Sequence, residues 1–272
     1  MKYMGGVLLL PLFLSTAQAG SNEATGLEQA HLTQSASLIF QNECASKNAC
    51  LTSWNKGEEF ASLGIGHFIW YPAGTKKVFN ESFPALLIFM QQHGARLPGW
   101  LADKPDQANP WKNRAAFLAA YDCKQMQALR SFLIHSKALQ ARFMQQRLHA
   151  SLPSLLLTVD AAAQDHIRSQ FEYVAGSPMG FYVLMDYVNF KGEGISLNER
   201  YQGKGWGLLQ VLEQMKVNQS GLIAIQAFAD AADAMLTRRV SLSPAQRNEQ
   251  RWLPGWRKRL STYRREAQKS PH

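Results

Sequence analysis

The chain has 272 residues, 46% of them hydrophobic, and carries 29 Lys or Arg residues against 20 Asp or Glu residues. This hydrophobic content excludes a generally disordered chain, and the length suits one large domain or two lobes that share a core. The formal net charge of +9 favours an anionic partner, because long-range attraction raises the rate of encounter with polyanions.

The N-terminal segment 1–19 has the pattern of a secretory signal peptide. Lys2 supplies a positive charge, an apolar run follows from Val7 to Leu14, and Ala17-Gln18-Ala19 matches a cleavage site of small residues. The run is too short to span a bilayer, and no later segment approaches the roughly 20 apolar residues that a span requires. We therefore expect a periplasmic or secreted protein without stable membrane insertion, whose polyanionic partner is the cell wall rather than nucleic acid.

The first half of the mature chain predicts helices around one short β element. Apolar spacing over residues 23–42 fits a buried helix, and a polar loop flanked by cysteines follows it. Residues 58–71, EEFASLGIGHFIWY, are aromatic and β-branched with two glycines, a composition typical of a β-hairpin. A helix is expected over 85–93, after an early helical proline. The residues 97–111, rich in Pro and Trp, predict a structured loop.

Helices dominate the second half, because apolar residues recur there three and four positions apart. The expected helices span residues 113–121, 124–135, 137–148, 161–174, 179–189, 206–215 and 222–239. A glycine-rich stretch, 190–207, interrupts the pattern. The last segment carries a stripe of Trp252, Trp256, Leu260 and Tyr263 beside basic residues, which predicts packing with a solvated basic face. The expected fold class is therefore mainly α, with a small β part (α+β).

Three cysteines, Cys44, Cys50 and Cys123, would meet an oxidising compartment after export. An odd number leaves one free thiol or a pairing with another chain. Cys44 and Cys50 could close a short loop, although the sequence does not exclude Cys123 as a partner. No His and Cys spacing resembles a metal site, so neither a metal nor another cofactor is expected.

Glu43 has the placement that a general acid needs. A glycosidase requires one carboxylic acid that protonates the leaving oxygen, and usually a second carboxylate that activates water or stabilises the oxocarbenium ion. The acid must keep its proton near neutral pH, which calls for shielding by apolar groups. Glu43 stands where the first buried helix ends, just after Ile39 and Phe40.

The second carboxylate is expected from the hairpin segment, which begins with two acidic residues. Side chains alternate along a strand, so Glu58 and Ser62 would face the same side. If Ser62 faces the cleft, Glu58 does too. The glycines at 64 and 66 leave room for a sugar ring or a helix to approach the backbone.

Glu43, a loop, and then Ser62-Leu63-Gly64-Ile65-Gly66-His67 resemble the Glu, hairpin and Thr-x-Gly-x-Gly-His arrangement of phage-type lysozymes. The resemblance implies Glu43 as general acid, Ser62 as the hydroxyl that handles water and Glu58 as the second carboxylate. The related chitosanases also place a carboxylate shortly before such a Thr. His67 is read as a structural residue beside the substrate rather than a proton shuttle. The resemblance covers about residues 39–71, and the gap between Glu43 and Ser62 is wider than in phage lysozymes.

That resemblance implies a single lysozyme-like catalytic domain over residues 20–272. Its two lobes would be a hairpin lobe, about 43–75, and a helical lobe, about 80–266, with the substrate between them.

A second candidate acid is Glu193, in the glycine-rich stretch. Glu193 and the later Gly207-Leu208-Leu209-Gln210 are similar to the catalytic Glu and the Gly-Leu-Met-Gln of soluble lytic transglycosylases, although Gly194 stands where that family usually has Ser. The preferred interpretation makes this stretch the opposite wall of the groove. Its expected sugar contacts are Tyr187, Asn189, Lys191, Glu193, Tyr201 and Gln210. Beside the hairpin, Trp54 and Asn55 would stack on and orient a sugar.

The sequence therefore predicts an exported, monomeric glycoside hydrolase or transglycosylase that cleaves a β-1,4-linked amino-sugar polymer. The basic balance favours peptidoglycan over chitosan, because a cationic polymer would be repelled. Two alternatives remain: an enzyme of the same fold that acts on another β-linked glycan, and a non-catalytic wall-binding or inhibitor-type protein with a degenerate lysozyme fold.

Overall fold

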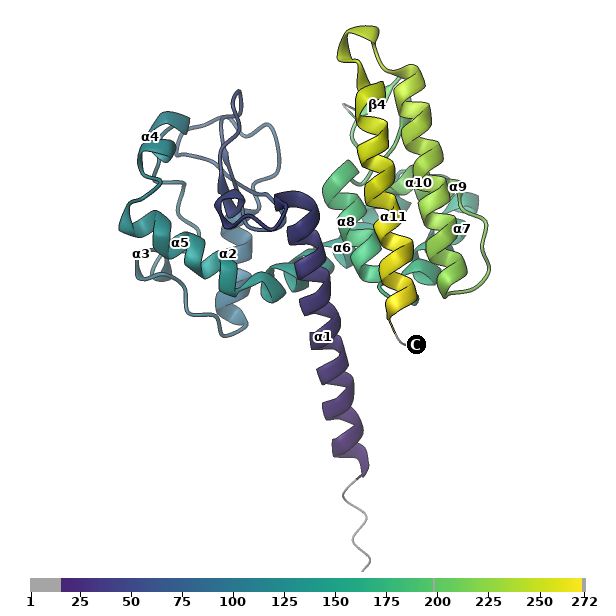
Figure 1. Cartoon of the computed structure of the whole chain (residues 1–272), viewed down its shortest axis with the longest axis horizontal. Coiled ribbons are helices and arrows are strands. Elements are labelled where there is room, and N and C mark those ends of the chain that lie inside the picture. Colours follow the sequence, from purple (N-terminus) through teal and green to yellow (C-terminus); the bar gives the residue numbers. More distant parts are fainter. Residues whose placement is uncertain (1–15, 198, 271–272) are drawn as a thin grey trace, which may run out of the picture.

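The computed structural model describes residues 16–197 and 199–270, and the surroundings of side chains from residue 29 onward. The chain is mainly helical with two small antiparallel sheets, which confirms the predicted fold class at that level (Figure 1). Residues 1–15 of the expected signal peptide lie outside the described residues, and the first helix already begins at Thr16. Of the helices in the described part of the chain, none combines the length and apolar character needed to cross a membrane.

The first half of the chain folds around a three-stranded sheet of order β1-β2-β3. Its elements are α1 (Thr16–Cys44), η1 (Asn48–Leu51), β1 (Thr52–Ser53), β2 (Ala61–Leu63), β3 (Phe68–Trp70), α2 (Phe83–Gln92), α3 (Gly99–Ala102), α4 (Arg114–Ala119), α5 (Lys124–His135) and α6 (Lys137–Leu156). The helix predicted over 124–135 is confirmed at both ends. The helix predicted to end at residue 148 continues to Leu156 and contains Pro153.

Helices α2 to α5 pack beside this sheet (Figure 1). The prediction from the sequence assigned these residues, from about 80 onward, to the other lobe. The reason is a cluster of aromatic rings around Trp70, which packs against Phe83, Trp100 and Trp111 with centroid separations of 4.9, 6.2 and 6.2 Å. Its indole nitrogen also donates to the carbonyl of Gln107 at 2.9 Å. Burial of these rings attaches the Pro- and Trp-rich segment and its neighbouring helices to the sheet.

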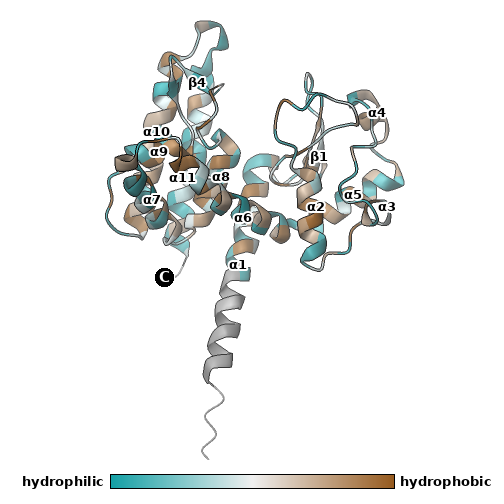
Figure 2. Ribbon diagram, turned by 180° about the vertical axis from the view of Figure 1, so that it is seen from behind, coloured by the Kyte–Doolittle hydropathy of each residue, from teal (hydrophilic) through white to brown (hydrophobic). Residues whose placement is uncertain are grey.

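The second half forms a separate group of helices on the other side of α6 (Figure 1). Its elements are α7 (Ala161–Ala175), α8 (Gly180–Lys191), β4 (Arg200–Tyr201), β5 (Lys204–Gly205), α9 (Leu208–Gln214), α10 (Leu222–Leu242), η2 (Ala245–Arg247), η3 (Glu249–Trp252) and α11 (Leu253–Lys269). The glycine-rich stretch contains the small hairpin β4–β5. The helices of both groups alternate between hydrophobic and hydrophilic stretches (Figure 2), and their buried residues form one continuous core.

Helix α6 joins the two groups and also holds the β2–β3 turn. The fully buried Gln140 of α6 accepts a hydrogen bond from the backbone N–H of Ile65 at 2.8 Å and donates to the carbonyl of Leu133 at 2.7 Å. Gly64 is required in this turn, since its φ is +69° and a Cβ there would lie 2.3 Å from Oε1 of Gln140. The turn, and with it His67, is therefore positioned from the α6 side.

Candidate active site

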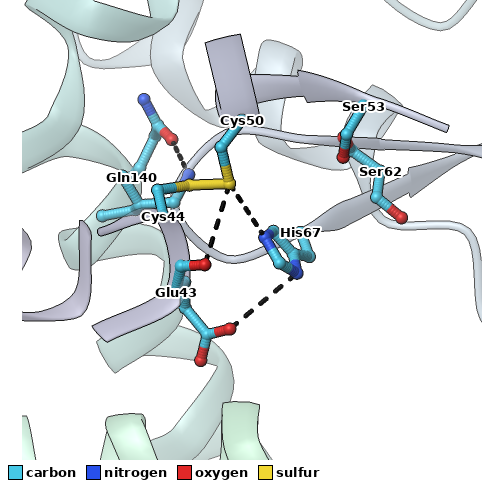
Figure 3. Close-up of a disulfide and its surroundings, with 8 residues drawn as sticks. Glu43, Cys44, Cys50, Ser53, Ser62, His67 and Gln140 are labelled. Atoms are coloured by element: carbon cyan, nitrogen blue, oxygen red, sulfur yellow. Dashed lines mark hydrogen bonds and ion pairs between the residues drawn. A yellow bond between two sulfur atoms is a disulfide. The ribbon is translucent and has the colours of Figure 1, made fainter. Parts of the chain in front are cut away.

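Glu43 lies at the meeting point of α1, the β2–β3 turn and α11. It stands in the last turn of α1, and its side chain is 13% exposed. One carboxylate oxygen accepts a hydrogen bond from the guanidinium of Arg259, and the other lies 3.9 Å from Nδ1 of His67 (Figure 3). The carboxyl group is thus held between two basic side chains while keeping some access to solvent.

A buried carboxylate, Asp186 of α8, shares the guanidinium of Arg259. Asp186 is fully buried and accepts two hydrogen bonds from Arg259, each of 2.8 Å. It also accepts from the hydroxyl of Tyr263 at 2.6 Å and from the amide of Asn42 at 3.1 Å. Burial alone would lower the pKa of Arg259, but the carboxylates of Asp186 and Glu43 raise it above its usual value. Asp186 therefore compensates the positive charge beside Glu43.

The disulfide Cys44–Cys50 fixes the chain just after Glu43, and Cys123 is free. This confirms the short loop that the sequence left open as one of the possible pairings. The sulfur of Cys50 lies 3.7 Å from Nε2 of His67 (Figure 3), so the bridge packs against the histidine ring. With Cys44 and Cys50 bonded to each other, neither sulfur is a thiolate that could hold a metal beside His67.

Glu58 does not share a strand with Ser62. Strand β2 begins only at Ala61, and Glu58 lies in the turn between β1 and β2, where its carboxylate accepts from the amide of Asn55 at 3.1 Å. The alternation that linked Glu58 to Ser62 therefore does not apply. The register pairs Ser62 with Ser53, so this turn joins the strands at the end of the sheet remote from His67. Ser62 itself is 5% exposed.

Trp54, expected to stack on a sugar, belongs to the core. It is 4% exposed and packs edge-on against Phe117, with ring centroids 5.6 Å apart. Its indole nitrogen donates to the carbonyl of Glu58 at 2.7 Å. Asn55 is exposed and holds the carboxylate of Glu58, so both residues build the β1–β2 turn.

A cleft runs beside the β2–β3 turn. A cavity of about 200 Å³ is lined by Gly66 of the turn, Phe68 of β3, Arg147 of α6, Asn189 and Glu193, together with Met144, Leu148, Met185 and Val188. A second cavity, of about 460 Å³, shares Val188 and Asn189 with the first and continues past Lys191, Glu199, Tyr201, Trp206, Arg239 and Arg247. The structure therefore brings together four predicted contact residues, Asn189, Lys191, Glu193 and Tyr201.

The prediction that Tyr187 and Gln210 contact a sugar is wrong, because their polar groups form hydrogen bonds within the fold. Tyr187 is fully buried, and its hydroxyl donates to the carbonyl of Trp206 at 2.8 Å. Gln210 is 8% exposed; it accepts from the N–H of Gly207 at 3.0 Å and donates to the carbonyl of Gly194 at 3.1 Å. Both side chains shape the glycine-rich stretch and do not face a substrate.

A larger cavity, about 790 Å³, lies among α1, α6 and the start of α8. It is lined mainly by apolar residues together with His31 and His149, and none of the described residues that line it is Asp or Glu. The two cavities near the β2–β3 turn are lined by acids, Glu193 in the first and Glu199 in the second.

Sequence reasoning missed Asp186, Arg259 and Glu199. Asp186 is a lone acid within the apolar run FYVLMDYV, which is a signal for a buried carboxylate with a cationic partner. Burial raises the pKa of Glu199, and the nearby charge of Glu193 raises it further, while Arg239 opposes the shift. Glu193 lines the first cavity and Glu199 lines the second, so each cavity has one carboxyl group in its lining.

No family model, curated protein or solved structure matches this chain. The likeness of residues 39–71 to phage-type lysozymes therefore stands on the motif itself.

Proposed function

We propose that the protein is an exported glycosidase, a hydrolase or a lytic transglycosylase, that cleaves a β-1,4-linked amino-sugar polymer, with peptidoglycan as the leading substrate. The observation that carries the proposal is the carboxyl group of Glu43, shielded and held by Arg259 and His67 at the junction of the two groups of elements. Its place in the Glu, hairpin and Gly-x-Gly-His pattern supports a lysozyme-like, two-lobed arrangement.

Glu43 is the group that delivers the proton to the leaving oxygen. One carboxyl oxygen of Glu43 accepts a hydrogen bond from Arg259, and the other oxygen points towards the ring of His67. Because Asp186 binds the same guanidinium through two hydrogen bonds, the cation beside Glu43 is compensated by a second, buried anion. This arrangement fixes the position of the Glu43 carboxyl group at the junction of α1 and α11.

Two carboxylates are candidates for the second function, the activation of water or stabilisation of the oxocarbenium ion. Glu58 is the one that the motif implies, although it lies in the β1–β2 turn. Glu193 lines the cleft wall opposite Gly66. Replacing each by Gln separates them, since loss of the second carboxylate lowers kcat strongly while loss of a turn residue does not.

The charge of the cleft supports an anionic glycan as substrate. Arg147 lines the first cavity, and Lys191, Arg239 and Arg247 line the second, each cavity having one acid in its lining, Glu193 and Glu199 respectively. The chain as a whole carries a net charge of +9. Such a surface attracts a wall polymer that bears carboxylates and repels chitosan.

The test is the release of soluble sugar fragments from purified sacculi. Glu43→Gln keeps the shape of the side chain and should abolish release while circular dichroism remains that of the wild type. Glu172→Gln, at an exposed position of α7, is the matched control and should retain full activity. A wild-type protein that cleaves no β-linked glycan in a panel would refute the proposal, and cleavage of a glycan other than peptidoglycan would redirect it to that substrate.

A second candidate function is non-catalytic binding to the wall. The observation that favours it is the ion pair between Glu43 and Arg259. This pair joins α1 to α11, so Glu43 would have a structural role without any catalytic one. Tight binding to sacculi that survives the double replacement of Glu43 and Glu58 by Gln, without any cleavage by the wild type, would establish this function instead.

A further inference from the structure

Lys191, the last residue of α8, is a buried cation without an anionic partner. It is 8% exposed, and its ammonium group lies 3.6 Å from the ring centroid of Trp256 and 4.0 Å from that of Phe190. Within residues 16–197 and 199–270, no carboxylate comes within ion-pair distance of this nitrogen. Burial of an unpaired charge is costly, and two aromatic faces offset only part of that cost.

Glu249 of η3, whose charge acts on Lys191, already accepts hydrogen bonds from three other side chains. It accepts hydrogen bonds from Arg239 at 2.7 and 2.9 Å, from Arg247 at 3.1 Å and from the hydroxyl of Tyr201 at 2.7 Å. Burial would raise the pKa of Glu249, but the hydrogen bonds from Arg239, Tyr201 and Arg247 lower it to about 2. The two guanidinium groups and the carboxylate thus neutralise one another in part, and Lys191 lines the cavity as a cation without an ion-pair partner among the described residues.

The cavity that Lys191 lines adjoins the cleft beside the β2–β3 turn. Its volume is about 460 Å³, and it shares Val188 and Asn189 with the smaller cavity that reaches Gly66. The charges of Glu43 and Arg259 also act on the ammonium of Lys191. A polymer bound along the cleft would therefore extend one of its substituents into the cavity.

We propose that the cavity binds a carboxylate carried by the glycan, with the ammonium of Lys191 as its anchor and Asn189 and Tyr201 beside it. The inference rests on the proposed function, and it narrows the substrate to amino-sugar polymers whose sugars carry acidic substituents. A charge-assisted hydrogen bond from a shielded ammonium is strong, and a single free cation matches the single charge of a carboxylate. A doubly charged phosphate would require a cluster of free cations, and Arg239 and Arg247 are committed to Glu249.

The protonation of Lys191 gives the binding a pH dependence. Burial, and then the charge of Arg239 from α10, lower the pKa of Lys191 to about 7, while Glu249 from η3 and Glu43 from α1 oppose the shift and Arg259 from α11 adds to it. The ammonium is therefore present below pH 7 and is lost as the pH rises above it. Glu199, which lines the same cavity, has a pKa raised by burial, so its carboxylate takes up a proton at a higher pH than an exposed glutamate does.

The test uses N-acetylmuramic acid and N-acetylglucosamine, which differ by one lactyl carboxylate. Neither contains a glycosidic bond, so the wild-type chain serves for binding, measured by NMR titration at pH 6 and pH 8.5. We expect the wild type to bind the acid more tightly at pH 6 than at pH 8.5, and the uncharged sugar equally at both. Lys191→Met should weaken binding of the acid about tenfold at pH 6, which corresponds to the loss of about 1.4 kcal/mol. Lys204→Met, at an exposed position of β5, is the matched control and should leave both affinities unchanged.

Equal binding of the two sugars by the wild type, or unchanged binding of the acid by a folded Lys191→Met variant, would overturn the inference. Binding of inorganic phosphate in preference to the acid would also overturn it. The proposed function fails separately: a wild type that binds the acid through Lys191 but cleaves no glycan retains this site and loses the catalytic proposal. A wild type that cleaves sacculi and an uncharged chitin oligomer equally well, with no effect of Lys191→Met on either, retains the catalytic proposal and loses this site.

Discussion

Asp186 and Arg259 form a buried ion pair that joins α8 to α11, with both hydrogen bonds 2.8 Å long. The pair satisfies Asp186 at a position with no solvent exposure, and one guanidinium nitrogen extends onward to Glu43. The core of the second group of helices and the candidate acid are therefore parts of one polar network.

Removal of one partner of this pair should be strongly destabilising. Asp186→Leu leaves Arg259 buried beside Glu43 alone, and breaking a buried pair costs about 3–5 kcal/mol. The free energy of unfolding in urea measures the loss. Arg257→Leu is the comparison, because Arg257 pairs with Asp233 on the surface, where an ion pair contributes little. This variant should unfold at the same urea concentration as the wild type. Equal stability of the Asp186 variant and the wild type would contradict the role given to this network.

Lys191 should make stability increase with pH in the alkaline range. Its pKa is about 7 in the folded protein against 10.5 for an unperturbed lysine side chain, so between these values the unfolded chain binds more protons. The free energy of unfolding therefore rises as the pH increases through this window, and Lys191→Met should lack this part of the rise. Urea unfolding at pH 7 and pH 9.5 compares the wild type with the variant, and Lys204→Met should follow the wild type at both values. A parallel pH dependence in the wild type and Lys191→Met would show that the lysine does not titrate as described.

Gly64→Ala should destabilise the β2–β3 turn by more than its backbone conformation alone requires. The new Cβ would meet Oε1 of Gln140, which already binds the N–H of Ile65. Gly57→Ala is a matched control, because Gly57 also has a positive φ, +89°, but has open space around it. Strain at a positive φ costs about 1–3 kcal/mol in both variants, and the clash adds to this only at Gly64. Thermal unfolding should rank Gly64→Ala as the less stable of the two, and the reverse order would argue against the role of Gln140.

Loss of the Cys44–Cys50 disulfide should loosen the end of α1 and with it Glu43. The bridge spans a sequence separation of 6 residues, a short loop for which the stabilisation is about 2 kcal/mol. The double replacement by Ser should lower the melting temperature and reduce sacculus cleavage. Cys123→Ser is the control, because Cys123 is free and caps α5, a position that Ser also suits. Full activity of the double Ser variant would show that the bridge does not position the acid.

Local periodicity was sufficient to predict most helices and the hairpin. The helix over 124–135 and the hairpin around Gly64 follow from residues close together in the sequence, and the structure places both there. The packing of α2 to α5 on the sheet was not predictable in this way, since it depends on rings as far apart in the chain as Trp70 and Trp111.

Only part of the candidate site, Glu43 and the β2–β3 turn, was predictable from the sequence. Glu43 and the glycine turn follow from a local motif, whereas Arg259 looked like one of several basic residues on a solvated helix face. Its orientation depends on Asp186, and a pairing across a separation of 73 residues leaves no periodic trace. The error at Glu58 has a different cause, because the alternation argument assumed a strand that begins at Glu58, three residues before Ala61.

The bond from Arg259 to Glu43 connects positions 216 residues apart, almost the full extent of the described chain. A polypeptide emerging from the ribosome cannot form this contact until α11 has been synthesised and has docked. Proteolytic removal of α11 would likewise leave Asp186 without its counter-ion. Assembly of the polar network around Glu43 is thus coupled to the docking of α11.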